Sequence, residues 1–186
     1  MNEKLKTDLS KFDNSWYKPG KNFIVRVSWY FINAAFINSS FPFSDIKILL
    51  LRIFGAKVGK NVTIKPKVNI KYPWHLMIGN NVWIGENAWI DNLTKVVIKD
   101  NACVSQGAML LTGNHHYKKS TFDLITGKIT IGEGAWVGAQ AVVCPGIIIH
   151  EHAVLTVGSI ATKNLEAYSV YQGNPAVKIK DRIIKQ

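Results

Sequence analysis

The sequence IGEGAWVGAQAVVCPGIII, residues 131–149, carries an aliphatic residue at every sixth position, and the period continues to residue 161. The repeated positions are Ile131, Val137, Val143, Ile149, Leu155 and Ala161. An α-helix needs apolar spacings of three and four and a strand a spacing of two, so neither fits as a long single element. Three six-residue repeats instead make one triangular turn of a parallel β-helix, whose aliphatic residues point inward. We therefore predict an all-β coil.

The same period extends upstream in three groups. Its positions are Val58, Ile64, Ile70, then Ile78, Ile84, Ile90, then Ile98, Val104, Leu110. The groups start 20 residues apart, two more than three repeats need, so corner bulges must absorb the extra residues. Positions 98 and 131 lie 33 apart, which leaves 15 residues beyond one turn of 18. We expect a β-helix domain at 56–166 with an extruded loop at 112–128.

The overall composition limits the partners. The 186 residues include 23 Lys and Arg against 12 Asp and Glu, a net charge of +11 that favours a polyphosphate cofactor or an acidic membrane surface. No run of five basic residues occurs, so we expect no nucleic-acid binding. Cys103 and Cys144 form no motif, and the first residues lack the apolar segment of a signal peptide. We therefore expect a cytoplasmic protein.

Three further motifs carry a family resemblance. They are IGNNVWIGENAWI at 78–90, TGNHHY at 112–117 and YQGNPAVKIK at 171–180. With the repeat at 131–149 they resemble the hexapeptide-repeat acyltransferases, and the amino-terminal part is most similar to the colanic acid biosynthesis acetyltransferases of that family. The resemblance implies a left-handed coil, against the usual right-handed crossover, and a homotrimer with clefts between subunits. We also expect a short C-terminal helix in the tail, residues 167–186.

The resemblance implies an O-acetyltransferase that moves an acetyl group from acetyl-CoA to a sugar hydroxyl in exopolysaccharide biosynthesis. A sugar hydroxyl is a poor nucleophile near neutral pH, so the transfer needs a base. His115 matches the position of the family's catalytic imidazole, and His116 is the substitute candidate or a contact to the acceptor. Ala139 matches the position whose backbone amide stabilises the oxyanion.

The resemblance also implies a coenzyme A channel that the tail completes. The matching residues are Trp136, Gly138, Ser159, Ala161, Thr162, Lys163, Gly173, Asn174, Pro175, Lys178 and Lys180. The sequence departs from the family at Val177, where relatives have a cation, so contacts to the phosphates are shifted or weaker. On the acceptor side, Asp91 and Asn92 could bond sugar hydroxyls, although turn chemistry alone also accounts for an Asp-Asn pair.

The amino-terminal extension, residues 1–55, is predicted to hold two helices. From Phe23 to Phe43 the only charged residue is Arg26, but Asn and Ser interrupt the stretch, so an amphipathic helix fits better than a membrane span. A second helix is predicted from Ser44, as its cap, to Phe54. In the first helix, one apolar stripe is expected at Phe23, Val27, Tyr30, Ala34 and Ile37. In the second helix, a buried stripe is expected at Ile46, Leu49, Leu50 and Ile53. The helices either close the open end of the coil or dock on the inner membrane.

Alternative functions stay open at this point. N-acetylation of an amino sugar uses the same fold and donor, and a scaffold protein could keep the fold without the chemistry, although His115 and an intact GAWVGA at 134–139 argue against it. Some hexapeptide-repeat proteins resemble γ-carbonic anhydrases, which bind zinc through three histidines. The adjacent His115 and His116 point in different directions on an extended chain, so we expect no metal site.

Overall fold

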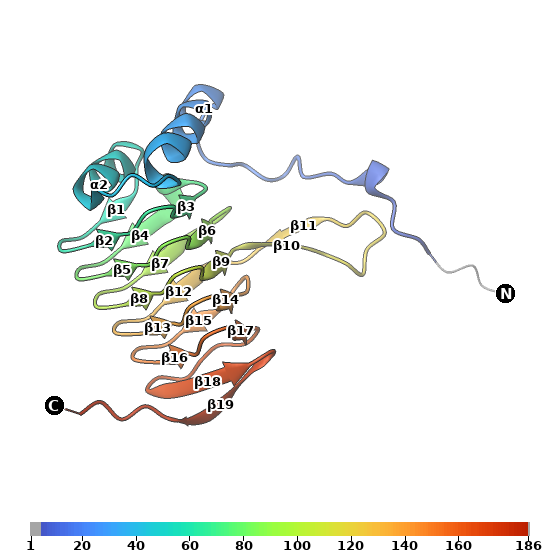
Figure 1. Ribbon diagram of the computed structural model, residues 1–186. Helices are drawn as coiled ribbons and strands as arrows, with labels where there is room; N and C mark the ends of the chain where they lie inside the picture. Colours follow the sequence, from blue (N-terminus) through green and yellow to red (C-terminus); the bar gives the residue numbers. More distant parts are fainter. Residues whose placement is uncertain (1–4, 186) are drawn as a thin grey trace.

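The computed structural model describes residues 5–185, which wind into a three-sided parallel β-helix capped by helices at one end (Figure 1). The first face contains β1 (Lys57–Val58), β4 (Leu76–Ile78), β7 (Val96–Ile98), β12 (Ile129–Ile131) and β15 (Ile148–Ile149). The second contains β2 (Thr63–Ile64), β5 (Trp83–Ile84), β8 (Cys103–Val104), β13 (Trp136–Val137), β16 (Val154–Leu155), β18 (Ser169–Gly173) and β19 (Ala176–Asp181). The third contains β3 (Asn69–Ile70), β6 (Trp89–Asp91), β9 (Met109–Leu111), β14 (Val142–Val143) and β17 (Ile160–Ala161).

The six-residue period forms the core. Ile84 pairs in register with Ile64 on one side and Val104 on the other, and all three side chains are fully buried. The backbone of each turn bonds to the next, as in the Gly85 amide that donates to the Val104 carbonyl at 2.7 Å. Stacked turns therefore satisfy the peptide groups and exclude water from the aliphatic column. The prediction of a parallel β-helix is confirmed.

Most corners are two-residue turns whose second residue adopts a left-handed backbone conformation. Gln140, for example, has φ of 55°. The first position of such a turn accepts proline, because its φ is near −60°. Pro66 and Pro145 occupy that first position in two of the turns, directly before Lys67 (φ 57°) and Gly146 (φ 84°). Proline is thus compatible with the repeat at the corners.

Helices cover the end of the coil at β1–β3 (Figure 1). They are α1 (Phe23–Ile32), the π-helical turn η2 (Asn33–Ile37) and α2 (Ser44–Ile53), with short 3-10 helices η1 (Leu9–Lys11) and η3 (Pro73–His75) elsewhere. Trp29 anchors α1: its ring is buried, and its indole N–H donates to the Ile70 carbonyl at 2.9 Å. No helix among the described residues is long and apolar enough to cross a bilayer.

The orientation of α2 differs from the sequence prediction. In α2 the buried residues are Lys47, Ile48 and Leu51, while Ile46, Leu49 and Ile53 of the predicted stripe are exposed. Lys47 is buried because its amine donates to the carbonyls of Ile64 and Lys65, and Ser44 Oγ bonds Ile64 rather than capping its own helix. In α1, the stripe residues Phe23 and Tyr30 are 70% and 69% exposed. Polar contacts to the first turn of the coil, such as those of Trp29 and Lys47, orient the helices.

The tail is a β-hairpin and not the expected C-terminal helix. β18 continues the second face by pairing with β16, and β19 folds back antiparallel to β18. The sequence VKIK at 177–180 alternates with period two, which suits a strand, and Gly173 with φ of 104° permits the turn. The hairpin covers the last edge of the second face, which an isolated coil would leave unpaired.

Candidate active site

The extruded loop is positioned by the third face of the coil. β9 pairs with β6 up to Leu111 opposite Asp91, and the buried Thr112 then donates from both its amide and its hydroxyl to the Asp91 carbonyl. Beyond it, β10 (Gly113–His115) and β11 (Leu124–Thr126) form an antiparallel hairpin that protrudes from the coil (Figure 1). A Cβ on Gly113 would lie 2.4 Å from Leu93 Cδ1, so a larger residue at this exit would require the Leu93 side chain to move.

His115 ends β10 with its ring held on one side. Its Nδ1 lies 2.9 Å from the Phe122 carbonyl, and the ring stacks on Phe122 at 4.5 Å between centroids. A carbonyl only accepts, so Nδ1 must donate, which leaves Nε2 of the neutral imidazole unprotonated. Phe122 presents this carbonyl from a left-handed conformation, φ 53°, that is costly for an aromatic residue. The loop therefore fixes the tautomer that a general base requires.

His115 opens onto a pocket of about 480 Å³ between the hairpin, the coil and an amino-terminal arm, residues 5–21. Phe12 of the arm packs 5.6 Å from the His115 ring, and Asn14 and Tyr17 also line the pocket. Tyr17 donates to the Leu93 carbonyl at 2.7 Å. Burial, with smaller contributions from Tyr72 and Asp91, raises the pKa of Tyr17, so its phenol stays neutral and cannot act as the base. Aromatic walls with a few polar groups suit a sugar.

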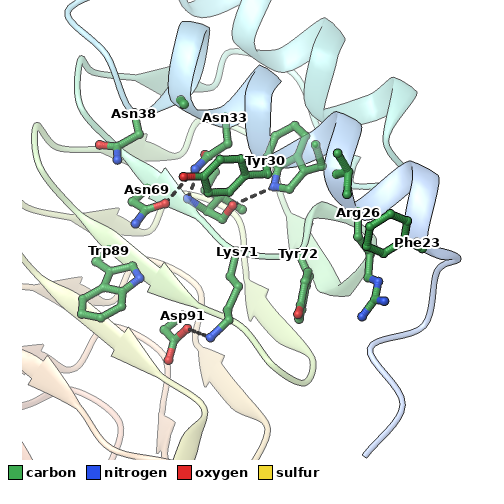
Figure 2. A pocket seen from close by; sticks show the side chains of 14 residues that line it. Phe23, Arg26, Tyr30, Asn33, Asn38, Asn69, Lys71, Tyr72, Trp89 and Asp91 are labelled. Atoms are coloured by element: carbon green, nitrogen blue, oxygen red, sulfur yellow. Dashed lines mark hydrogen bonds and ion pairs between the residues drawn. The ribbon is translucent and has the colours of Figure 1, made fainter.

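Of the two residues predicted to bind the acceptor sugar, one lines the His115 pocket and the other does not. Asp91 lines the His115 pocket and has an Oδ1 that lies 2.9 Å from the amine of Lys71 (Figure 2). Asn92 is fully buried, and its side chain accepts from the Tyr72 amide at 2.9 Å and donates to the Tyr72 carbonyl at 2.6 Å. The Asn92 amide thus stabilises the turn between two coils and does not face the pocket. His116 follows His115 and is not among the residues that line the pocket.

Ala139 lies at a different edge of the coil, between β13 and β14. A hollow of about 330 Å³ surrounds it, lined also by Trp136 and Gly138. Trp136 is 46% exposed, and its indole N–H donates to Ser105 Oγ at 2.8 Å. Among the described residues, no carbonyl or side chain accepts from the Ala139 amide. The amide is therefore available to an oxyanion in the hollow.

The remaining predicted cofactor residues fall into two groups. Ser159 and Ala161 are buried in the coil, backbone included, so in a single chain neither residue faces a cofactor. The exposed group is Thr162, Lys163, Gly173, Asn174, Pro175, Val177, Lys178 and Lys180. Lys178 is engaged by Glu166 at 3.0 Å and Asp181 at 2.9 Å, and these carboxylates raise its pKa. Lys163 and Lys180 have no carboxylate within salt-bridge distance among residues 5–185, which leaves them the better candidates for phosphate contacts.

A single chain does not bring His115 and Ala139 together. The hairpin leaves the coil at the corner between the third and first faces, whereas Ala139 occupies the corner between the second and third. The two pockets share no lining residue. In residues 5–185, no three His, Cys, Asp or Glu side chains converge in a way that could hold a metal ion.

Sequence reasoning missed the residues that the arm and the neighbouring coil supply. Phe12, Asn14 and Tyr17 come from a segment without a repeat, and Lys71 and Tyr72 lie in a corner that the period does not distinguish. The arm contains three aromatic residues, Phe12, Trp16 and Tyr17, but no period that would place them beside the loop. Long-range contacts, such as the Asp8 amide with the Ser120 carbonyl at 2.8 Å, cannot be seen in a local pattern.

Comparison with known proteins agrees with this architecture. The chain is 36% identical over 177 residues to the Escherichia coli protein named "Putative colanic acid biosynthesis acetyltransferase WcaF", covering 95% of this chain and 97% of that one. It is 31% identical over 135 residues to the galactoside O-acetyltransferase of Escherichia coli, covering 71% and 66%. The solved structure of a galactoside acetyltransferase in complex with coenzyme A matches with a TM-score of 0.75 at 26% identity, covering 85% and 80%. No family model matches.

The β-helical fold, the extruded hairpin and the similar proteins together define the class of this protein. It is an acetyltransferase built on a β-helix. The chain belongs to the hexapeptide-repeat acetyltransferase family. This membership confirms the prediction that the chain is an acyltransferase.

Proposed function

We propose that this enzyme transfers the acetyl group of acetyl-CoA to a hydroxyl of a sugar, with His115 as the general base. The donor is acetyl-CoA, as expected for the family and in keeping with the coenzyme A in the similar solved structure. One observation carries the assignment of the base: Nδ1 of His115 lies 2.9 Å from a carbonyl, so Nε2 is left to accept a proton inside a pocket of sugar-binding character.

In the proposed reaction, His115 and Ala139 act on the sugar hydroxyl and on the thioester of acetyl-CoA. His115 Nε2 takes the proton of the sugar hydroxyl while its oxygen attacks the thioester carbon. The Ala139 amide donates to the oxyanion that forms. The carbon–sulfur bond then breaks, and the imidazolium returns its proton to the departing thiolate of coenzyme A. Asp91 bonds acceptor hydroxyls from the pocket wall, and Lys163 and Lys180 contact cofactor phosphates.

We infer that the active unit is a homotrimer of left-handed coils. His115 and Ala139 lie at different corners of one chain, so a neighbouring copy must supply the second group. A cyclic trimer would place the hairpin of each chain against the Ala139 hollow of the next. Exposed side chains on the second and third faces, Trp83, Trp89 and Trp136, give such an interface an apolar component.

The similarity to known proteins also supports a proposal for the biological role of the enzyme. The relative named for colanic acid biosynthesis spans nearly the whole chain and favours a role in exopolysaccharide biosynthesis at the cytoplasmic side of the inner membrane. The exposed apolar side chains of α1 and α2 and the charge of +11 would favour peripheral contact with an acidic bilayer.

The test is release of coenzyme A from acetyl-CoA, measured by a thiol reagent, with a panel of neutral glycosides and amino sugars as acceptors. We expect turnover with at least one neutral glycoside and a product whose acetyl group mild alkali removes, as for an ester. An alkali-stable product formed only from amino sugars would show N-acetylation instead. Failure to bind acetyl-CoA would favour the scaffold alternative.

A further inference from the structure

A second groove, of about 650 Å³, lies between α1 and the first turns of the coil (Figure 2). Its helical wall contains Phe23, Arg26, Val27 and Tyr30, and its floor contains residues of β3 and β6. The π-helical turn η2 widens the helix at this point and adds further polar groups to the wall. Of these, Asn33 is fixed by its bond to Asn69 at 2.8 Å. The hydrogen bond between Asn33 and Asn69 thus fixes the helical wall of the groove to the coil.

The groove continues into the His115 pocket. Lys71, Tyr72 and Asp91 line both cavities. A molecule whose reacting sugar lies beside His115 can therefore extend past Tyr72 and under α1 without leaving the surface. An acceptor that consisted of one small sugar would not use this second space.

The groove offers cationic groups for an anionic ligand. Arg26 has a buried Nε without a hydrogen-bond partner and makes no salt bridge with any carboxylate of residues 5–185. In the view of Figure 2, the Tyr72 ring lies between the Arg26 guanidinium and the Lys71 amine. Lys71 is already paired with Asp91, so Arg26 carries the uncompensated charge. A guanidinium that is half-buried and unpaired fits a phosphate group.

The helical wall of the groove is apolar and continues outward. Phe23 and Tyr30 line the groove and are 70% and 69% exposed, and Ile24 and Phe31 beside them are 73% and 64% exposed. Phe23, Ile24 and Phe31 have hydrocarbon side chains, which offer no hydrogen-bond partners to the base and ribose of a nucleotide. It fits a hydrocarbon chain that leads from the phosphate toward a bilayer.

We propose that the groove under α1 binds the phosphate-linked lipid carrier of the acceptor, so that the enzyme acetylates a glycan attached to a polyprenyl diphosphate. Arg26 bonds the diphosphate, Phe23 and Tyr30 contact the first hydrocarbon units, and the sugar extends past Tyr72 to His115. This inference rests on the proposed function, whose acceptor it specifies.

Farnesyl diphosphate, a short polyprenyl diphosphate without sugar, serves as the probe for the full chain. Calorimetric titration should show saturable binding near one per chain, weaker binding of inorganic pyrophosphate and farnesol, and weaker binding of uridine diphosphate. Arg26→Gln should weaken farnesyl diphosphate binding about tenfold, the loss expected for a charge-assisted contact. Lys60→Gln removes an exposed cation elsewhere and should leave binding unchanged. Tyr30→Ala should weaken binding, and Ile148→Ala, at an exposed apolar position on the coil away from α1, should not.

The same preparations are titrated with acetyl-CoA, so the two proposals can fail separately. Retained acetyl-CoA binding in Arg26→Gln shows that the variant is folded. Acetyl-CoA binding without farnesyl diphosphate binding, or equal binding by wild type and Arg26→Gln, overturns the lipid carrier and leaves the transferase standing. Uridine diphosphate that binds as tightly as the probe and competes with it would replace the lipid by a nucleotide carrier. Absence of acetyl-CoA binding contradicts the proposed function itself.

Discussion

At the scale of single residues, the sequence placed His115 in the extruded loop but did not predict the contacts that surround its ring. TGNHHY placed His115 at the head of a loop, but the bond from Nδ1 to the Phe122 carbonyl depends on a backbone conformation that no residue pattern predicts, because aromatic residues rarely adopt it. Asn92 shows the opposite case. It belongs to an Asp-Asn pair that suggests sugar binding, yet its amide is fully occupied by the backbone of Tyr72.

Substitution of His115 tests the role of the base. His115→Ala should lower kcat by about 10²- to 10⁴-fold, because a positioned base contributes that much to proton transfer. Acetyl-CoA affinity should stay close to that of wild type, since the imidazole acts in the transition state. His116→Ala is the matched control, measured by the same thiol-release assay. Full activity in His115→Ala, or an equal loss in His116→Ala, would move the base elsewhere.

The amide at Ala139 can be removed without changing a side-chain charge. Ala139→Pro deletes the N–H, and the fold should survive because Pro66 and Pro145 occupy the equivalent turn position elsewhere. We expect kcat to fall about 10²- to 10³-fold, the usual loss for one oxyanion donor. Glu151→Pro makes the same change at another corner and should keep activity. Equal activity of the two variants would exclude Ala139 as the donor.

At the scale of elements, the coil was predictable and the helices only in part. A six-residue period specifies the interior of every turn, so strands and loop were found from the spacing alone. The helices were placed near their correct residues, but the buried face of α2 was not, because Lys47 donates to two carbonyls of the coil and Ile46, Leu49 and Ile53 then face outward. The expected C-terminal helix failed since strand pairing with β16 was not visible locally.

The buried amine of α2 should make stability depend on pH. Burial lowers the pKa of Lys47 from its ordinary 10.5, so the unfolded chain holds its proton at pH values where the folded chain has lost it. The free energy of unfolding therefore gains a positive slope as pH rises from the lowered pKa toward 10.5. Denaturant titrations of Lys47→Met should lack this slope, while Lys60→Met, at an exposed position, should keep it. Identical slopes in wild type and Lys47→Met would contradict the burial.

At the scale of the whole molecule, the exposed faces of α1 and α2 gather at one end of the coil, the end that also holds the groove under α1 (Figure 1). The repeat predicted the body of the molecule, whereas the relation between His115 and Ala139 required the order of strands around it. Because the two residues lie at different corners of one chain, we propose that a second chain completes the site.

Membrane contact at the helical end can be measured with vesicles. Wild type should co-sediment with vesicles that contain acidic lipid more than an Ile24→Ser/Phe31→Ser variant, because both side chains are exposed on α1. Ile148→Ser, at an exposed apolar position on the coil, is the control. Negligible sedimentation of all three proteins would contradict the proposed membrane contact.

The proposed active site joins His115 of one chain to Ala139 of the next, and mixed assemblies test this arrangement most directly. His115→Ala and Ala139→Pro are co-expressed with different tags, doubly tagged assemblies are purified, and thiol release is measured with an acceptor that the wild type acetylates. Each interface needs an intact base from one copy and an intact amide from its neighbour, and a mixed trimer has one such interface of three, so the doubly tagged assemblies should show about a third of wild-type activity. Activity no higher than that of either parent variant would contradict a site shared between chains.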